Sequence, residues 1–511
     1  MICAAAWVRF YEREAGMSDV MTPTAEAPPV TDRGEPRNHA EQADRSERAL
    51  VGVFDTLGRG QIPFWVIDGY GGGAFDPVDI DILVPRRALP GQIATAVHES
   101  RERIGAALIS WDRDNQFVLA CERVPAAEAP PEFLRIHLRP DYRRAGRYFY
   151  DGNEVLDAQP TRAGGADTFA TPRTPREFAC YLIEKIAKRC LAPLHERVLC
   201  ETFKHDPAGC ANEIRRFWSA TEASLIESAA RSGDWEPVRR AQDNLHGTLR
   251  RGAFFRRPFW TIAYKLGKGL RRVREYLRPS AGLHVVMLGP DGVGKSTVVE
   301  VLQRDLAGAF CGIEYGTFAP GLLPRKPNVS GGGQPHGLPP RSHAASIVKA
   351  LWWIVYYSLG YHFTIRPVVA RGGLALNHRY CVDALVDGRR YRYKGPQWLL
   401  KLAWRLARKP DLVFLLDAPP EVVQARKKEV AFEETVRQRN EYRNLVEPMP
   451  NGHVIDSTQP VQDVVADVER VIFQFMAGRT ARRLGLPATA TAGQSSPRVA
   501  ASSAESSAGA A

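Results

Sequence analysis

The strongest constraint on the fold is a glycine-rich segment, GPDGVGKS, which runs from Gly289 to Ser296. It has the form G-x-x-x-x-G-K-[ST], in which backbone N–H groups turn inward around phosphate oxygens. An apolar run, HVVML, precedes the segment, and a helix-like run, STVVEVLQRDLAG, follows it. Because the N-terminus of that helix adds partial positive charge, this order of strand, loop and helix predicts a site for nucleotide phosphates.

Each part of this loop has an expected chemical role. Lys295 is expected to reach the β- and γ-phosphates of a nucleotide, and the Ser296 hydroxyl to ligate Mg²⁺. ATP and Mg²⁺ are therefore the expected cofactors. The predicted cofactor-binding residues are Gly289, Asp291, Gly292, Gly294, Lys295, Ser296 and Thr297.

Apolar runs and helical patterns alternate from Leu283 onward. This alternation is typical of a doubly wound α/β domain built on a parallel sheet. We place the domain at residues 281–478. The expected strands are His284–Gly289, Gly312–Tyr315, Gly373–His378, Asp411–Asp417 and Gly452–Asp456.

Several segments of this domain resemble the thymidylate kinase family. They are the loop GPDGVGKST, the run LVFLLDAPPEVVQARKKE, the helix-like FEETVRQRNEYRNL and the closing HVIDSTQPVQDVVADVERVI. The resemblance covers about residues 283–477 and implies one parallel sheet, an ATP site on the loop and a lid that closes over ATP. It implies that Arg426 is the lid cation nearest the transferring phosphate, where it would neutralise developing charge. It also implies that Asp291 faces the sugar of an acceptor nucleotide.

The family's Asp-Arg-Tyr motif corresponds here to NHRY, residues 377–380. The resemblance implies that Arg379 contacts the acceptor phosphate. His378 stands in place of an aspartate that belongs to the Mg²⁺ environment, and a neutral imidazole offers neither the charge nor the two oxygens of a carboxylate. Asp383 or Asp387, close by in the chain, would substitute for it, unless both are structural or solvated.

A long segment, residues 319–343, separates the second expected strand from the next helix. Small thymidylate kinases have no comparable insertion, and long loops in compact domains often act as lids or binding elements. The insertion resembles that of larger kinase-like proteins associated with bacterial polysaccharide gene clusters. A basic cluster further on, Arg389, Arg390 and Arg392, fits either an anionic acceptor or a solvated surface.

The N-terminal half begins with a mixed pattern over residues 46–175, with a helix expected at Glu47–Leu57 and strands at Phe64–Asp68, Asp79–Pro85 and Phe133–Leu138. This α+β pattern predicts a separate domain. A helical pattern then extends over residues 176–280.

The carboxylates Asp79 and Asp81 resemble the D-x-D pair of the nucleotidyltransferase fold, which holds Mg²⁺. Because alternate residues of a strand point to the same face, both can meet one metal ion. His137 stands where the family has a third carboxylate. We therefore expect this fold with weak or absent transferase activity. The alternative is a strand that ends in solvated aspartates.

Two segments raise the question of membrane contact. Residues 251–278 carry nine Lys or Arg and one Glu, interleaved with aromatic residues. The segment is either an amphipathic helix that lies on an anionic membrane or a linker helix packed on the kinase-like domain. It has no motif that supports nucleic-acid binding. The apolar run 345–365 is interpreted as a buried helix, with a membrane segment as the alternative.

Composition indicates the character of the two chain termini, the class of partner and the cellular compartment. Residues 1–45 are expected to form a disordered leader, with Met17 or Met21 as an alternative start, and residues 479–511 a disordered tail. The formal net charge is +12, which favours phosphate-bearing partners. The eight cysteines form no C-x-x-C pair, so a reducing, cytoplasmic setting is expected.

The sequence thus predicts an α/β protein: a P-loop doubly wound parallel sheet preceded by an α+β nucleotidyltransferase-like domain with a helical extension. The predicted reaction is Mg²⁺-dependent transfer of the ATP γ-phosphoryl group to a nucleoside monophosphate or related phosphate acceptor. Lys295, Arg379 and Arg426 are the predicted catalytic residues, and Ser296, Asp79 and Asp81 the predicted metal ligands. The alternative is an ATP-binding regulatory or scaffold protein with impaired chemistry.

Overall fold

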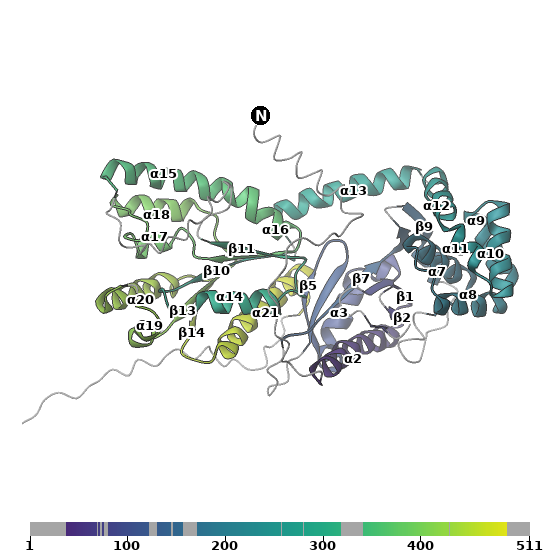
Figure 1. Cartoon of the computed structure of the whole chain (residues 1–511), viewed down its shortest axis with the longest axis horizontal. Helices are drawn as coiled ribbons and strands as arrows, with labels where there is room; N and C mark the ends of the chain where they lie inside the picture. Colours follow the sequence, from purple (N-terminus) through teal and green to yellow (C-terminus); the bar gives the residue numbers. More distant parts are fainter. Residues whose placement is uncertain are drawn as a thin grey trace, which may run out of the picture. The chain divides into compact units, whose positions relative to one another are not determined.

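The structure is a computed structural model (Figure 1). It describes residues 37–68, 70–71, 74–75, 80–121, 130–144, 147–156, 171–256, 258–279, 281–317, 341–428 and 430–487. Asp79, most of the long insertion and most of both termini lie outside the described residues. The chain divides into two compact units, Met1–Glu41 and Gln42–Ala511, and the second holds every site considered below.

The phosphate loop belongs to a five-stranded sheet in the order β11-β12-β10-β13-β14. All four pairings in this sheet are parallel. The predicted strands are confirmed with shifts of at most two residues at their ends. Their bounds are β10 Leu283–Leu288, β11 Ile313–Thr317, β12 Leu374–His378, β13 Leu412–Asp417 and β14 Gly452–Asp456.

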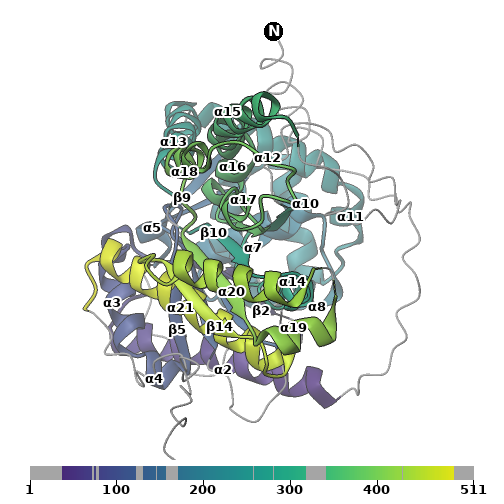
Figure 2. The same cartoon turned by 90° about the vertical axis from the view of Figure 1, so that its left-hand side faces the viewer.

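Helices cover both faces of this sheet, which is why every residue of β10 and β13 is buried. The helices α14 (Lys295–Asp305) and α21 (Val461–Leu484) share one apolar cluster with the sheet. On the other face, α15 (His343–Gly360), α18 (Gln397–Leu406) and α20 (Phe432–Val446) share a second cluster. Figures 1 and 2 show these layers, and they match the predicted doubly wound arrangement.

The N-terminal sheet also has five strands, in the order β1-β4-β7-β6-β5, and it is mixed. Only β4 and β7 pair in parallel. The bounds are β1 Trp65–Asp68, β4 Ile80–Leu83, β7 Phe133–Arg139, β6 Gln116–Cys121 and β5 Ala106–Trp111. Two hairpins accompany the sheet: β2 Tyr70–Gly71 with β3 Ala74–Phe75, and β8 Asp141–Arg144 with β9 Arg147–Asp151.

One long helix and several short ones lie around the N-terminal sheet. They are α2 (Arg37–Arg59), the 3₁₀ turn Arg86–Ala88, α3 (Gly91–Glu99) and α4 (Arg101–Ile104), with α5 (Gly152–Leu156) after β9. The helices α2, α3 and α4 share an apolar cluster with one face of the sheet. The helix α2 begins well before the expected Glu47, inside the segment assigned to a leader, so that boundary moves toward the N-terminus. The opposite face places Ile109, Val118 and Phe133 in the apolar cluster that contains α14 and α21.

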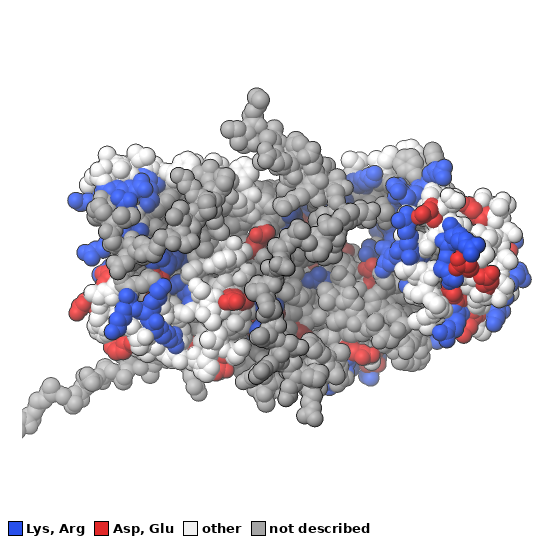
Figure 3. Space-filling view, in the orientation of Figure 1, with Lys and Arg blue, Asp and Glu red and all other residues white. Residues whose placement is uncertain are grey.

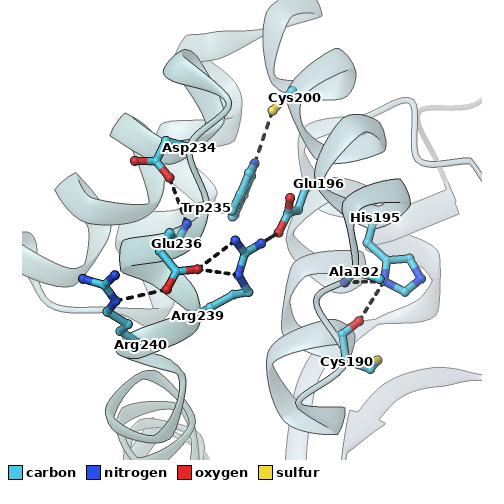
Figure 4. Close-up of polar contacts among 10 residues, drawn as sticks. All are labelled: Cys190, Ala192, His195, Glu196, Cys200, Asp234, Trp235, Glu236, Arg239 and Arg240. Carbon is cyan, nitrogen blue, oxygen red and sulfur yellow. Dashed lines mark hydrogen bonds and ion pairs between the residues drawn. The ribbon is translucent and has the colours of Figure 1, made fainter.

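The helical extension shares an apolar cluster with β1, β4, β8, β9 and α5 of the N-terminal domain. Its helices are α7 Pro175–Lys188, α8 Pro193–His205, α9 Pro207–Phe217, α10 Ala220–Ser232, α11 Glu236–Arg240, α12 Gln242–Arg256 and α13 Pro258–Leu277. Figure 4 shows how α8 and α11 are joined: buried Trp235 donates to Cys200 Sγ at 3.3 Å, and Arg239 pairs with Glu196 and Glu236. The described cysteines are free thiols, and burial raises the pKa of Cys210 to about 12.

Two features differ from the sequence expectations. The helix α21 passes the expected boundary at residue 479 and runs to Leu484, because Thr480 is buried and donates to Ile109 O at 3.0 Å. The run 345–365 forms α15 and a π-helical turn, Tyr361–Ile365, before α16 (Arg366–Ala370), but only one face of it is buried. Within the described part of the chain, no helix is long and apolar enough to cross a membrane.

Candidate active site

The phosphate loop connects β10 to α14 through glycines with positive φ angles. Gly289, Gly292 and Gly294 have φ values of 141°, 90° and 104°, a conformation that L side chains rarely adopt. A Cβ atom at Gly292 would lie 2.9 Å from Lys427 Cβ, in the segment that follows α19 (Pro420–Arg426). Glycine therefore permits both the turn of the loop and its close contact with the predicted lid segment.

Lys295 is buried at the first position of α14. Its Nζ donates to Gly289 O and to Pro290 O, at 2.7 Å in both cases. Burial lowers its pKa to about 8, although the Asp291 carboxylate opposes the shift. Ser296 and Thr297 are exposed beside it. The ammonium group is thus held by carbonyl oxygens of the loop, where phosphate oxygens would be better partners.

Asp291 connects the loop to the segment that follows β12. Its carboxylate accepts hydrogen bonds from Arg379 and from Arg390, and Lys295 Nζ lies 3.7 Å from Asp291 Oδ1. Burial alone would lower the pKa of the Arg379 guanidinium. The Asp291 carboxylate beside it nevertheless raises this pKa above its usual value. Three cations therefore surround one carboxylate.

Arg379 itself has a φ of 87°, which is uncommon for a residue with a side chain. Its backbone N–H donates to Met287 O at 3.0 Å, so the strand end is pinned while the side chain turns toward the loop. Such strained residues concentrate at functional sites.

A shallow pocket, open to solvent, lies between the phosphate loop, the segment after β12 and α20. Its lining combines carboxylates, guanidinium groups, phenols and an amide. The lining residues are Gly289, Pro290, Asp291, Arg379, Asp383, Asp387, Arg390, Tyr391, Gln438 and Tyr442. The structure thus brings Asp291 and Arg379, both predicted, together with Arg390 in one pocket.

The two candidate substitutes for a missing carboxylate are both buried. Asp383 accepts from Tyr380 N at 2.7 Å and from the Tyr442 hydroxyl at 2.6 Å. Burial raises its pKa, and the Tyr442 hydrogen bond opposes that shift. Asp387 accepts from Arg390 N at 3.0 Å. Both carboxylates therefore already organise the pocket wall.

His378 ends β12, next to Arg379. Burial lowers its pKa to about 3, and the positive charges of Lys295 and Arg379 add to the shift. Its Nδ1 lies 3.3 Å from the Tyr315 hydroxyl. The imidazole is therefore neutral at any ordinary working pH.

Arg426 lies beside the phosphate loop rather than in the pocket. The exposed side chain donates to Val293 O at 3.3 Å and to Ser457 O at 3.1 Å. The predicted lid cation thus lies against the glycine-rich loop, apart from Arg379.

One set of charged residues was missed by sequence reasoning. Asp417, buried at the end of β13, accepts from Arg439 at 2.7 and 2.8 Å and from Arg443 at 3.2 Å. These arginines are four residues apart on α20, which places them on one helix face. That spacing, together with an aspartate at a strand end, was the available signal. The pairing fixes the helix that carries Gln438 and Tyr442 into the pocket.

The N-terminal carboxylate site has a different neighbour from the one expected. Asp81 lies directly beside His137 in the β4–β7 register, as the sequence suggested. Arg139, two residues further along β7, forms an ion pair with Asp81 at 2.8 Å. Among the described residues, no group of three or more His, Cys, Asp or Glu side chains could hold a metal ion. Asp79 lies outside the described residues.

Comparisons with known proteins add little. No family model matches the chain, and no curated protein matches it. Among solved structures, a thymidylate kinase from Ehrlichia chaffeensis is similar, with 17% identity and a TM-score of 0.27 over 38% of this chain and 99% of that one. A similarity at this level is too weak to carry an argument about function.

Proposed function

We propose that the chain binds ATP on the phosphate loop and transfers its γ-phosphoryl group to a phosphate-bearing acceptor, such as a nucleoside monophosphate, held in the adjoining pocket. One observation supports this above all. The loop that carries Lys295 and the strand end that carries Arg379 meet at Asp291, so a nucleotide site and an anion site share a wall.

The loop fits a nucleotide triphosphate. The glycine turns leave room for phosphate oxygens, and the first N–H groups of α14 together with Lys295 would bind them. Mg²⁺ fits here through the exposed Ser296 hydroxyl and the phosphate oxygens, since this ion commonly uses few protein ligands. When bound, it would supply charge neutralisation between the phosphates.

The acceptor phosphate would be bound by Arg379 and Arg390. Both guanidinium groups are aimed at Asp291, and a planar guanidinium forms strong paired hydrogen bonds with phosphate. An arriving acceptor would therefore take over donors that the pocket has already oriented. Asp291 would keep the pair in place and meet the acceptor's sugar.

Arg426 would act from the nucleotide side. Its present partners are backbone carbonyls, one of them Val293 O in the loop itself. A movement of the C-terminal end of α19 would carry its guanidinium to the γ-phosphate, where it would neutralise the charge of the transferring group.

The alternative function is ATP binding without efficient transfer, in a regulatory or scaffold protein. The neutral His378 and the engaged Asp383 favour this alternative, because neither supplies a free carboxylate near the loop. The N-terminal domain fits a non-catalytic role as well, since Arg139 neutralises Asp81. We propose that this domain is nucleotidyltransferase-like and does not transfer nucleotidyl groups.

A turnover assay separates the two functions. The full chain is incubated with ATP, Mg²⁺ and a panel of nucleoside monophosphates, and ADP release is followed. Acceptor-dependent ADP release that Arg379→Ala weakens at low acceptor concentration supports the kinase. ATP binding with no acceptor-dependent release for any member of the panel supports the scaffold.

A further inference from the structure

The helix α13 turns its apolar side away from the protein. Six large apolar residues, between 50% and 84% exposed, follow one another at intervals of three and four. At about 100° per residue this spacing forms a single stripe along the helix. The residues are Phe259, Ile262, Leu266, Leu270, Val273 and Leu277.

The inward side of α13 is polar. Glu275 pairs with Arg113 at 2.9 Å, and Arg271 pairs with Asp114 at 2.9 Å. The Arg143 guanidinium stacks on the Tyr264 ring, 4.8 Å from its centroid. An amphipathic helix normally buries its apolar stripe and exposes its charges. Here charges hold the helix to the protein and leave the stripe outside.

A second stripe lies on α15 and the turn after it. Six large apolar residues on one side of this helix are 49% to 66% exposed, while Trp353 and Tyr357 on the other side are buried. The exposed residues are Val348, Leu351, Trp352, Val355, Leu359 and Phe363. The two stripes together are called the apolar ridge below.

Hydrogen bonds join α13 to the turn and the helix α16 that follow α15. The Tyr276 hydroxyl donates to His362 O at 3.0 Å, and Arg366 donates to Tyr276 O and Leu277 O. In Figures 1 and 2, α13 and α15 lie along the same side of the molecule. The ridge is therefore one surface.

The charges around the ridge have one sign. Lys265, Lys268, Arg272 and Arg274 are exposed on α13, and the sole acid of that helix, Glu275, pairs with Arg113 on the inward side. The sequence of α15 contains no Asp or Glu. In Figure 3 the described atoms along the upper edge, over α15 and the right end of α13, are white and blue. An anionic partner is therefore favoured.

We propose that the apolar ridge docks the protein on the surface of an anionic lipid bilayer, with α13 and α15 lying in the headgroup region. Apolar and aromatic side chains would enter the interface, and the flanking cations would contact anionic headgroups. A second copy of the chain is a poor occupant, because it would bring one cationic rim against another. The docking is peripheral, since no described helix can span a membrane.

Co-sedimentation with lipid vesicles tests the proposal. The full chain is mixed with vesicles of phosphatidylcholine, with and without phosphatidylglycerol, at low and high salt. We expect binding only to the anionic vesicles and weakening by salt. The double variant Leu266→Gln/Leu270→Gln should bind at least about tenfold more weakly, and Lys265→Gln/Arg274→Gln roughly tenfold.

Matched controls test whether the variants fold and whether binding to the vesicles is nonspecific. The variant Leu194→Gln/Val51→Gln changes two exposed apolar residues away from the ridge and should bind like the wild type. The circular dichroism of every variant should match that of the wild type, because all the changed side chains are exposed. A further variant, Leu351→Gln/Val355→Gln, tests the α15 half and should also weaken binding.

Three outcomes overturn the proposal. One is the absence of binding to anionic vesicles. Another is binding that neither ridge variant weakens. The third is a concentration-dependent dimer that the Leu266→Gln/Leu270→Gln variant dissociates and that does not bind vesicles, which would make the ridge an interface between copies.

Discussion

Replacing His378 by aspartate should increase phosphoryl transfer. The pKa of His378 is about 3, so at pH 7 the imidazole contributes no charge to the site. The cations that help to lower this pKa, Lys295 and Arg379, would stabilise an anion at the same position. The variant His378→Asp therefore places an ionised carboxylate beside the loop.

The size of the effect follows from what one oriented charged group contributes. Single preorganised groups are worth about 10²–10³ in kcat at their best, so a carboxylate added without further optimisation should give roughly a tenfold rise. The assay is ADP release at saturating ATP, Mg²⁺ and acceptor. The control is His378→Asn, which has nearly the same shape as aspartate and no charge.

The reasoning is refuted if His378→Asn raises kcat as much as His378→Asp, since charge would then not be the cause. It is also refuted if His378→Asp binds ATP like the wild type and leaves kcat unchanged. In that case another group already takes the place of the missing carboxylate. Asp387 would be the next residue to change, because Asp383 accepts two hydrogen bonds within the pocket wall.

Three further predictions follow from single contacts. Arg379→Ala should raise the acceptor KM roughly tenfold to hundredfold, the worth of a hydrogen bond to a charged group, while Arg405→Ala, changed at an exposed site on α18, should not. In urea unfolding, the free energy of unfolding should fall as the pH drops from about 6.5 to about 4, because burial lowers the pKa of His284 to about 4 and the unfolded chain binds the proton first. His284→Asn should reduce the slope of the free energy of unfolding against pH by about 1.4 kcal/mol per pH unit. An unchanged slope contradicts the assignment. The full chain, incubated with nucleotides labelled at the α-phosphate, Mg²⁺ and candidate acceptors, should transfer no nucleotidyl label, because Arg139 neutralises Asp81; α-labelling of an acceptor that Asp81→Ala removes would show a working transferase.

The sequence predicted the central strands of the C-terminal sheet well, because β10 and β13 are short, largely apolar runs with every residue buried. The run LVFLLD of β13 is an example, since both of its faces are covered by helices. The strands β5 and β6 were not predicted. Their sequences, AALISW and QFVLAC, are separated by a segment without a motif that predicts a hairpin.

The candidate site residues that lie within short sequence motifs could be predicted from the sequence. The loop residues and Arg379 lie in contiguous segments and could be identified in the sequence. The pairing of Arg390 with Asp291 joins residues far apart in the chain, so only the fold reveals it. Tyr442 enters the pocket from α20 for the same reason.

Hydropathy alone leaves the orientation of α13 open. The stripe of α13 has the spacing of an ordinary buried helix face, and the sequence allows both a packed linker helix and an amphipathic helix on an anionic membrane. Ion pairs on the opposite side of α13, such as Arg271 with Asp114, hold that polar side against the protein. Asp114 lies in the β5–β6 hairpin, which is distant from α13 in the sequence. Burial in such a case depends on tertiary contacts rather than on periodicity.

Calorimetric titration of the full chain with ATP and Mg²⁺ tests the central claim most directly. The ammonium group of Lys295 is held by carbonyl oxygens of the loop. We expect Lys295→Ala to abolish ATP binding and leave the fold intact. The control Lys204→Ala, an exposed lysine on α8, should bind like the wild type. ATP affinity that is unchanged in Lys295→Ala, with an unaltered melting curve, would contradict the assignment of this loop as the nucleotide site.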